Sequence, residues 1–208
     1  MSKLNFGGTP KSVDGGTNFW KPEDGKDNFV VLLSNPDPDD GNIAWSAEMV
    51  KMFTKSPYGK AYPINATWVY SGANDPKNVL APELKLQYTG LVMVAYQDGG
   101  EWKLGVWQVS MPVHRALATA ASVNDVVNKF ILVKKEGKNW TVSVAGKMKV
   151  PAEALKVAEK IPSQEEQEKI FGVYENADDV WAMLMERASV GSREELLVLF
   201  GKGDSELL

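Results

Sequence analysis

The strongest structural signal in the sequence lies in residues 84–110, LKLQYTGLVMVAYQDGGEWKLGVWQVS. Two β-rich segments, Leu84–Gln97 and Glu101–Ser110, flank Asp98-Gly99-Gly100, a short glycine-containing connection typical of a β-hairpin. Alternate positions of the first segment carry large apolar or aromatic side chains: Leu84, Leu86, Tyr88, Val92, Val94 and Tyr96. Because successive side chains of a strand point to opposite faces, this alternation predicts one inward face.

Further strands and one helix are predicted on both sides of this hairpin. The run Asn28–Ser34 (NFVVLLS) lies between Pro/Gly-containing turns and predicts a first strand. The segment Ile43–Phe53 is ambiguous between a strand and a short helix. The remaining predictions are a strand over Ile64–Tyr70, a helix that Pro112 opens and Asn124-Asp125 closes, and a second hairpin formed by Phe130–Lys135 and Asn139–Ala145.

The order of these elements points to one architecture. Strand, long insertion, two strands, helix and two strands is the order of an OB-fold, a five-stranded Greek-key barrel with a helix between its third and fourth strands. We therefore predict a mainly β fold with a helical C-terminal region, in which an OB-fold carries a long insertion (residues 35–83) after its first strand. A generic β-sandwich with a helical tail is the competing architecture.

Beyond Pro151 the pattern changes from strands to helices. Four helical segments are predicted: Ala152–Lys160, Ser163–Phe171, Ala177–Ala188 and Ser192–Phe200. Ser163 with Glu166, and Ser192 with Glu195, have the spacing of a capping box. The predicted organisation is thus a flexible arm over residues 1–18, an OB-fold body over 19–150 and an acidic helical region over 151–208.

The residue inventory excludes several kinds of chemistry. The 208 residues include no Cys and a single His, His114, so disulfides, thiol nucleophiles, Cys-rich zinc sites and histidine pairs are excluded. No phosphate-binding or dinucleotide-binding glycine motif is present. We therefore expect a protein that is not an enzyme, although a hydrolase built on carboxylates is left open as a third reading.

One acidic cluster has some of the spacing of a calcium-binding loop. It consists of Asp37, Asp39, Asp40 and Glu48, with Glu48 as the twelfth position counted from Asp37. Gly41 stands where a ligand should be, and Asn42 stands where the sharp-turn glycine should be. A solvated turn is therefore predicted here, and neither a metal nor another cofactor is expected.

The charge of the chain is unevenly distributed along the sequence. The net charge is −4, but residues 1–150 hold 17 basic and 14 acidic side chains, whereas residues 151–208 hold 6 and 13. A mildly basic body followed by a strongly acidic region suggests a polyanionic partner for the body. The acidic region is expected to fold onto or near the body and to compete with that partner, so ending the chain at Val150 should raise affinity at low salt.

Two segments of the body combine lysines with aromatic residues. Residues 49–74 contain no acidic residue, and residues 126–152 contain six lysines against one Glu136. Lysines bind a phosphate backbone and flat rings stack on unpaired bases, which is the combination used for single-strand binding. The candidates from these segments are Lys51, Phe53, Lys55, Tyr58, Lys60, Tyr62, Lys134, Lys135, Lys138 and Trp140. For aromatic residues on predicted strands, including Trp68 and Trp107, burial in the core is favoured instead.

The cations of the chain are almost all lysines. The chain has 20 Lys and 3 Arg, and only Arg115 lies in residues 1–150. Lysine acts as a point charge, whereas arginine forms paired hydrogen bonds with guanine edges. This composition favours tracking of a nucleic-acid backbone over reading of a base sequence.

Two motifs resemble those of phage-type single-stranded DNA-binding proteins. The first is Phe19-Trp20-Lys21-Pro22-x-x-Gly25 before the strand Phe29–Leu33, and the second is Val106-Trp107-Gln108-Val109-Ser110, followed by a helix and by a strand containing Lys134-Lys135-x-Gly137. The resemblance covers about residues 19–145 and implies an OB-fold that coats single-stranded DNA in replication, recombination or repair. It adds Trp20 and Lys21 to the candidate binding residues.

The chain departs from this family at two points. It lacks the Cys/His zinc module of some relatives, so zinc is not implied. An acidic C-terminal region that recruits replication or recombination proteins is usual in the family, but here Glu194–Phe200 is helix-like and the chain ends in Asp204-Ser205-Glu206-Leu207-Leu208.

The sequence thus predicts a DNA-binding protein of the cytoplasm of a prokaryotic or phage-infected cell. Apolar runs such as Phe29–Leu33 and Leu91–Ala95 are far shorter than a membrane span requires, so no membrane partner is expected. The alternative from another class is a non-enzymatic protein-interaction or virion-associated β-barrel module, in which the basic body docks an acidic protein.

Overall fold

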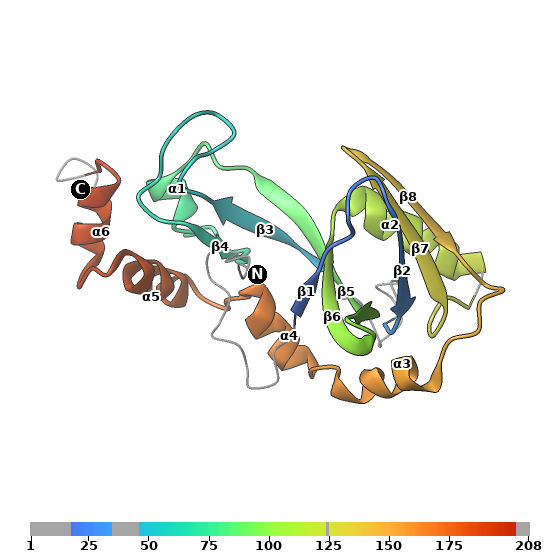
Figure 1. Ribbon diagram of the computed structural model, residues 1–208. Coiled ribbons are helices and arrows are strands. Elements are labelled where there is room, and N and C mark those ends of the chain that lie inside the picture. Colours follow the sequence, from blue (N-terminus) through green and yellow to red (C-terminus); the bar gives the residue numbers. More distant parts are fainter. Residues whose placement is uncertain (1–17, 35–45, 124, 203–208) are drawn as a thin grey trace. The chain divides into compact units, whose positions relative to one another are not determined.

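The computed structural model describes residues 18–34, 46–123 and 125–202. The elements in this part of the chain are, in order, β1 (Asn18–Trp20), β2 (Asp27–Leu32), β3 (Ser46–Met52), β4 (Ala66–Trp68), α1 (Lys77–Leu80), β5 (Leu86–Asp98), β6 (Glu101–Val109), α2 (Met111–Val123), β7 (Phe130–Glu136), β8 (Asn139–Val144), α3 (Ala152–Lys156), the 3₁₀ helix η1 (Val157–Lys160), α4 (Gln164–Phe171), α5 (Ala177–Ala188) and α6 (Arg193–Leu199) (Figure 1). Strands and helices contribute about equally, so the fold is sheet-rich rather than mainly β.

The chain forms two compact units that do not follow its linear order. We call the described residues within 12–47 and 88–165 the sheet unit, and those within 48–87 and 166–208 the insertion–tail unit. The sequence suggested a body over 19–150 and a tail over 151–208. The structure instead groups the insertion with most of the tail, and it groups residues 151–165 with the sheet.

In the sheet unit, the strongest sequence signal forms the predicted hairpin. β5 and β6 pair antiparallel from Gly90 opposite Val109 to Asp98 opposite Glu101. Gly99 and Gly100 both have positive φ, as the two central residues of a type I′ turn require. β2 pairs with β5 on one side and β7 on the other, β8 pairs with β7, and β1 pairs parallel with β6. The resulting strand order is β1-β6-β5-β2-β7-β8.

The sheet buries apolar residues on both of its faces. One face packs with α2 around a core that consists of Val30, Leu32, Val92, Val94, Trp107, Val109, Val113, Leu117, Val126, Ile131 and Val133. The other face is buried as well, since Leu91, Met93 and Ala95 are inaccessible to solvent. α3 and η1 lie against β6. The alternation in residues 84–96 therefore identified one of two buried faces.

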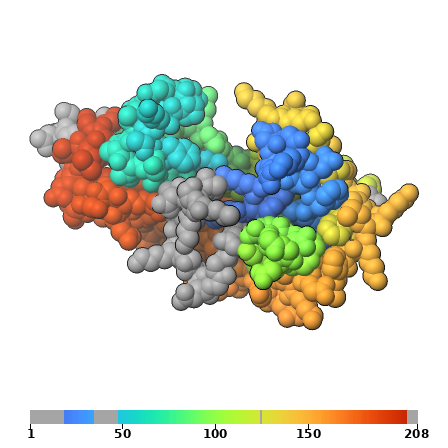
Figure 2. Space-filling model, viewed as in Figure 1, coloured from blue at the N-terminus to red at the C-terminus, as the bar shows by residue number. Residues whose placement is uncertain are grey.

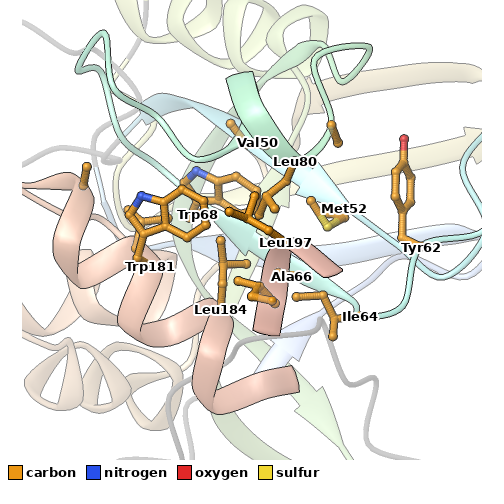
Figure 3. Close-up of a cluster of buried hydrophobic side chains, with 14 residues drawn as sticks. Val50, Met52, Tyr62, Ile64, Ala66, Trp68, Leu80, Trp181, Leu184 and Leu197 are labelled. Atoms are coloured by element: carbon orange, nitrogen blue, oxygen red, sulfur yellow. The ribbon is translucent and has the colours of Figure 1, made fainter. Parts of the chain in front are cut away.

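In the insertion–tail unit, β3 and β4 form an antiparallel pair, so the ambiguous segment Ile43–Phe53 contains a strand. Its core is drawn from both halves of the unit: Val50, Met52, Tyr62, Ile64, Ala66, Trp68, Leu80 and Ala81 from the insertion, and Ala177, Val180, Trp181, Leu184, Leu196 and Leu197 from α5 and α6 (Figure 3). Each large buried side chain contributes about 1.5–3 kcal/mol of hydrophobic stabilisation. The C-terminal helices are therefore structural parts of this unit.

The predicted helices of the C-terminal region are confirmed, and side chains cap two of them. Asn176 Oδ1 accepts a hydrogen bond from the Asp179 N–H (2.9 Å) at α5, and Ser192 Oγ accepts one from the Glu195 N–H (3.2 Å) at α6. Glu195 in turn accepts from the N–H of Gly191 (2.7 Å). In the predicted capping box, Glu195 would accept from the N–H of Ser192. In the structure it accepts from the N–H of the preceding residue, Gly191.

The uneven charge along the sequence largely disappears in the folded units. Among the described residues, the insertion–tail unit carries 9 basic and 11 acidic side chains, and the sheet unit carries 12 and 10. The strongly acidic helices share a unit with the basic insertion, and the mildly acidic residues 151–165 join the sheet. Over the same described residues, net charges of +5 up to residue 150 and −5 from residue 151 become +2 and −2 in the two units.

Candidate nucleic-acid interface

Three tryptophan rings form a row in the sheet unit. Trp20 on β1 lies edge-on to Trp107 on β6, with ring centroids 5.3 Å apart, and Trp107 lies 6.4 Å from Trp140 on β8. Trp107 is buried, Trp20 is half-buried, and Trp140 is 37% exposed. The buried ring thus lies at the centre of the row, and Trp140 at one end is exposed and available for stacking.

Lys135 lies beside the exposed ring of this row. Its Nζ is 5.9 Å from the centroid of Trp140, the residue directly opposite it on β8. The structure thus brings together three of the predicted site residues, namely Trp20, Lys135 and Trp140. It joins them through Trp107, which the sequence assigned to the core and which is indeed buried.

The turn of the β7–β8 hairpin carries a further lysine. Gly137 and Lys138 connect the strands, and of these two residues only Gly137 has positive φ, as in a type II′ turn. Lys138 is exposed and makes no ion pair with any residue that the structure describes. Lys134 is paired with Glu136 (3.0 Å), which raises the pKa of the Lys134 ammonium through their hydrogen bond.

The loop between β1 and β2 is tied to the same hairpin. Gly25 N–H donates to the Lys135 carbonyl (2.8 Å), with Gly25 at φ +74°. The Asp24 carboxylate accepts from the Gly137 N–H (3.1 Å) and from Lys135 Nζ (3.2 Å). Figure 1 shows the β1–β2 loop arching at the same end of the unit as the β7–β8 turn. Lys21, in the same loop, is exposed.

The Asn28 side chain holds this loop independently of Asp24. Its Nδ2 donates to the carbonyls of Lys26 (2.8 Å), Glu23 (3.0 Å) and Val133 (3.2 Å), and its Oδ1 accepts from the Glu23 N–H (2.9 Å). Gly25, the glycine of the aromatic-Lys-Pro-x-x-Gly motif, therefore lies in the turn that brings the β1–β2 loop back to β7. The motif is a structural clamp as well as a source of Trp20 and Lys21.

The other basic and aromatic segment forms a loop in the insertion–tail unit. Lys55 bridges to Ala61, Ser56 N–H donates to the Lys60 carbonyl (2.9 Å), and Gly59 has φ +78°. Tyr58 is 66% exposed near the tip of this loop, and Phe53 is exposed at its start. Lys51 lies on β3 and is half-buried.

Tyr62 requires a correction, because its ring is not available for stacking. It is 2% exposed and belongs to the core of the insertion–tail unit (Figure 3). Its hydroxyl donates to Glu83 Oε1 (2.8 Å), and the same oxygen is 2.8 Å from Lys60 Nζ. Lys60 is therefore neutralised by a carboxylate of its own chain.

Glu83 organises this small network electrostatically. The hydrogen bond from Lys60 lowers the pKa of Glu83 to about 2, against an opposing effect of burial. Burial, and then the hydrogen bond to Glu83, raise the pKa of Tyr62 to about 12. Glu83 had no role in the sequence interpretation, because nothing in its local pattern indicates that it will meet a residue 21 positions earlier.

The predicted site residues thus fall into two separate groups. Trp20, Lys21, Lys134, Lys135, Lys138 and Trp140 belong to the sheet unit, and Lys51, Phe53, Lys55, Tyr58, Lys60 and Tyr62 belong to the insertion–tail unit. The sequence interpretation missed Asp24, which contacts the hairpin lysine. Its position directly before a turn glycine is the signal that could have identified it.

Asp37, Asp39 and Asp40 of the calcium-like cluster lie outside the described residues, as does most of the predicted arm over residues 1–18. Within residues 18–34, 46–123 and 125–202, no group of three or more His, Cys, Asp or Glu side chains is placed to hold a metal ion. Nor does this part of the chain contain a helix with both the length and the apolar character of a membrane span. Comparison of the chain with protein-family models, curated proteins and solved structures finds no match.

Proposed function

We propose that the protein binds single-stranded DNA without strong sequence preference, through an OB-fold formed by β2, β5, β6, β7 and β8. The observation that carries this proposal is the exposed Trp140 ring, which has Lys135 beside it and the exposed Lys138 two residues away. A ring that stacks on a base contributes about 1–3 kcal/mol, and adjacent ammonium groups attract the backbone.

The strand pairing supports the OB-fold component of the proposal. β2 lies between β5 and β7, and α2 connects β6 to β7, as the five-stranded order requires. A barrel closes when the two end strands of such a sheet meet. Within these five strands, the contact between Trp107 on β6 and Trp140 on β8 links the two outermost strands through their side chains, while β1 pairs along the outer edge of β6.

The test is a tryptophan-fluorescence titration of the full chain with oligo-dT and, separately, with duplex DNA. We expect oligo-dT to quench the fluorescence, the duplex to have little effect, and binding to weaken steeply as salt increases. Absence of quenching, or binding that is indifferent to salt, would remove this proposal.

Matched lysine variants locate the binding site within the fold. Lys138→Gln should reduce the slope of log affinity against log salt by roughly 0.7, the value for one single-strand phosphate contact. Lys103→Gln makes the same change of charge on the β5–β6 hairpin, where Lys103 is paired with Asp98 (2.7 Å), and should leave the slope unchanged.

A protein-interaction module is the second candidate, and exposed apolar residues of α6 favour it. Val198 and Leu199 are adjacent on this helix and both are exposed, while Leu196 and Leu197 face the core. In that case the fluorescence would not respond to oligo-dT, and α6 would present the docking surface.

A further inference from the structure

The β7–β8 turn holds an anion, and that anion is a side chain of the protein. Asp24 Oδ1 accepts from the backbone N–H of Gly137, and Oδ2 accepts from the Lys135 ammonium. A backbone N–H and an ammonium group aimed at one carboxylate are the donors that also bind a phosphate group. The chemistry of this site is therefore that of an oxyanion site.

The site is accessible from solvent. The Asp24 side chain is 55% exposed and Lys135 is 30% exposed, while Gly137 and Lys138 are also at the surface. Figure 2 shows the β7–β8 turn, in yellow, projecting from the surface beside the blue segment that contains the β1–β2 loop. An external phosphate can therefore reach the donors that Asp24 occupies.

The site stabilises a negative charge. The Gly137 N–H, and next the Lys135 ammonium, lower the pKa of the Asp24 carboxyl below its ordinary value. Exposed ion pairs of this kind contribute little to stability, so a polyanion that brings several phosphates to the hairpin lysines can displace the single carboxylate.

The loop does not depend on this carboxylate for its position. The Gly25 N–H bond to Lys135 and the four hydrogen bonds of the Asn28 side chain remain when Asp24 releases the turn. Asp24 can therefore leave the donors by rotation of its own side chain, without unfolding of the loop.

We propose that Gly137 N–H and Lys135 form a phosphate subsite of the β7–β8 turn, and that Asp24 occupies it as a built-in competitor which a polyanion must displace. In the context of the proposed function, the ligand is a backbone phosphate next to the base that stacks on Trp140. The competitor that the sequence assigned to the acidic tail is, in the fold, a single carboxylate of the β1–β2 loop.

The test compares two neighbouring carboxylates. Asp24→Asn removes the competing charge and keeps an oxygen that can accept from Gly137, whereas Glu23→Gln removes the same charge one residue away. The Glu23 carboxylate pairs with Lys26 within the loop, whereas the Asp24 carboxylate pairs with Lys135 of the hairpin. Both variants should retain the wild-type melting temperature within a few degrees, since neither group is buried.

The affinity of the full-length variants is measured by calorimetry with linear polyphosphate, which has phosphates but no bases, and with oligo-dT. We expect Asp24→Asn to bind polyphosphate severalfold more tightly than both wild type and Glu23→Gln. The gain should disappear in a Lys135→Gln background, because the carboxylate then has no ammonium to neutralise.

Equal affinity of the Asp24 and Glu23 variants would overturn the proposal, because a general charge effect then explains any gain. Weaker binding by Asp24→Asn would also overturn it, and would make Asp24 a positioning residue for Lys135. The polyphosphate titration decides these outcomes even if oligo-dT fails to quench tryptophan fluorescence, which would count against the proposed function alone.

Discussion

The β7–β8 hairpin and the loop over residues 53–62 have similar sequences and different structures. Each combines lysines with aromatic residues, and each was predicted to bind a nucleic-acid strand. In the hairpin, Trp140 remains at the surface with Lys135 beside its ring. In the loop, Tyr62 is buried and Glu83 pairs with Lys60, so only Tyr58 and Phe53 present exposed rings. Composition therefore shows that a segment has the groups for binding, but tertiary packing decides which groups are available.

The largest expected effect is loss of the helices that support the loop over residues 53–62, in a truncation that also removes α3 and η1 from β6 of the sheet unit. Ending the chain at Val150 removes α5 and α6, which supply Trp181, Leu184 and Leu196 to the core around the loop. We expect residues 48–87 to lose their fold, as measured by near-ultraviolet circular dichroism and by protease sensitivity of this segment. This outcome replaces the gain in affinity that the sequence suggested for the same truncation.

A shorter truncation is the matched control. Ending the chain at Lys202 removes the acidic residues Asp204 and Glu206 and leaves both described cores intact. The melting temperature of that variant should equal the wild-type value. A native near-ultraviolet spectrum for the chain that ends at Val150 would contradict the structural role of α5 and α6.

Two aromatic substitutions sharpen the comparison at the level of single rings. Trp140→Ala should weaken oligo-dT binding by about 1–3 kcal/mol, because it removes the exposed stacking surface. Tyr62→Phe should leave oligo-dT affinity unchanged and lower the free energy of unfolding by about 1 kcal/mol, because it removes a hydrogen bond to Glu83. Affinity is measured by calorimetry and stability by urea unfolding. The reverse pattern would contradict this division of roles.

The smallest effect concerns pH and involves the loop alone. The pKa of Glu83 is lowered in the folded state, so its contribution to stability is present above its ordinary pKa of 4.5. That contribution is lost as the pH falls from about 4.5 towards 2. The unfolding free energy should therefore fall less steeply with acid in Glu83→Gln than in wild type over this range. Parallel curves for the two proteins would show that the Lys60–Glu83 pair does not contribute to stability.

Local sequence patterns predicted the secondary structure well for particular reasons. The Gly99-Gly100 turn, Pro112 at the start of α2, and Ser192 before α6 all act through bonds and conformations within a few residues. Such signals are contained in the sequence itself. The packing of α5 and α6 against β3 and β4 depends on contacts between residues more than 100 positions apart in the sequence, and no local pattern encodes it.

The candidate site was predicted in part for the same reason. Trp140 and Lys135 were identified by the combination of lysines and aromatic residues in their segment, and the short turn between β7 and β8 places them opposite each other. Trp20 was identified by its motif, but its link to Trp140 through Trp107 follows from the parallel pairing of β1 with β6. Asp24 and Glu83 were missed because their hydrogen-bond partners are distant in the sequence and become neighbours only when the chain has folded.

The amino-acid sequence alone determined the elements, the excluded chemistries and the lysine-rich character of the cations, because these depend on residue type and on short spacings. The tertiary structure decided the units, the distribution of charge between them and the exposure of each aromatic ring. The insertion and the acidic helices bury their apolar side chains against each other, and this brings a net acidic and a net basic segment into one unit. Hydrophobic packing of the insertion against the acidic helices therefore sets the net charge of this unit. Counting charges along the sequence had assigned the basic and the acidic residues to separate regions.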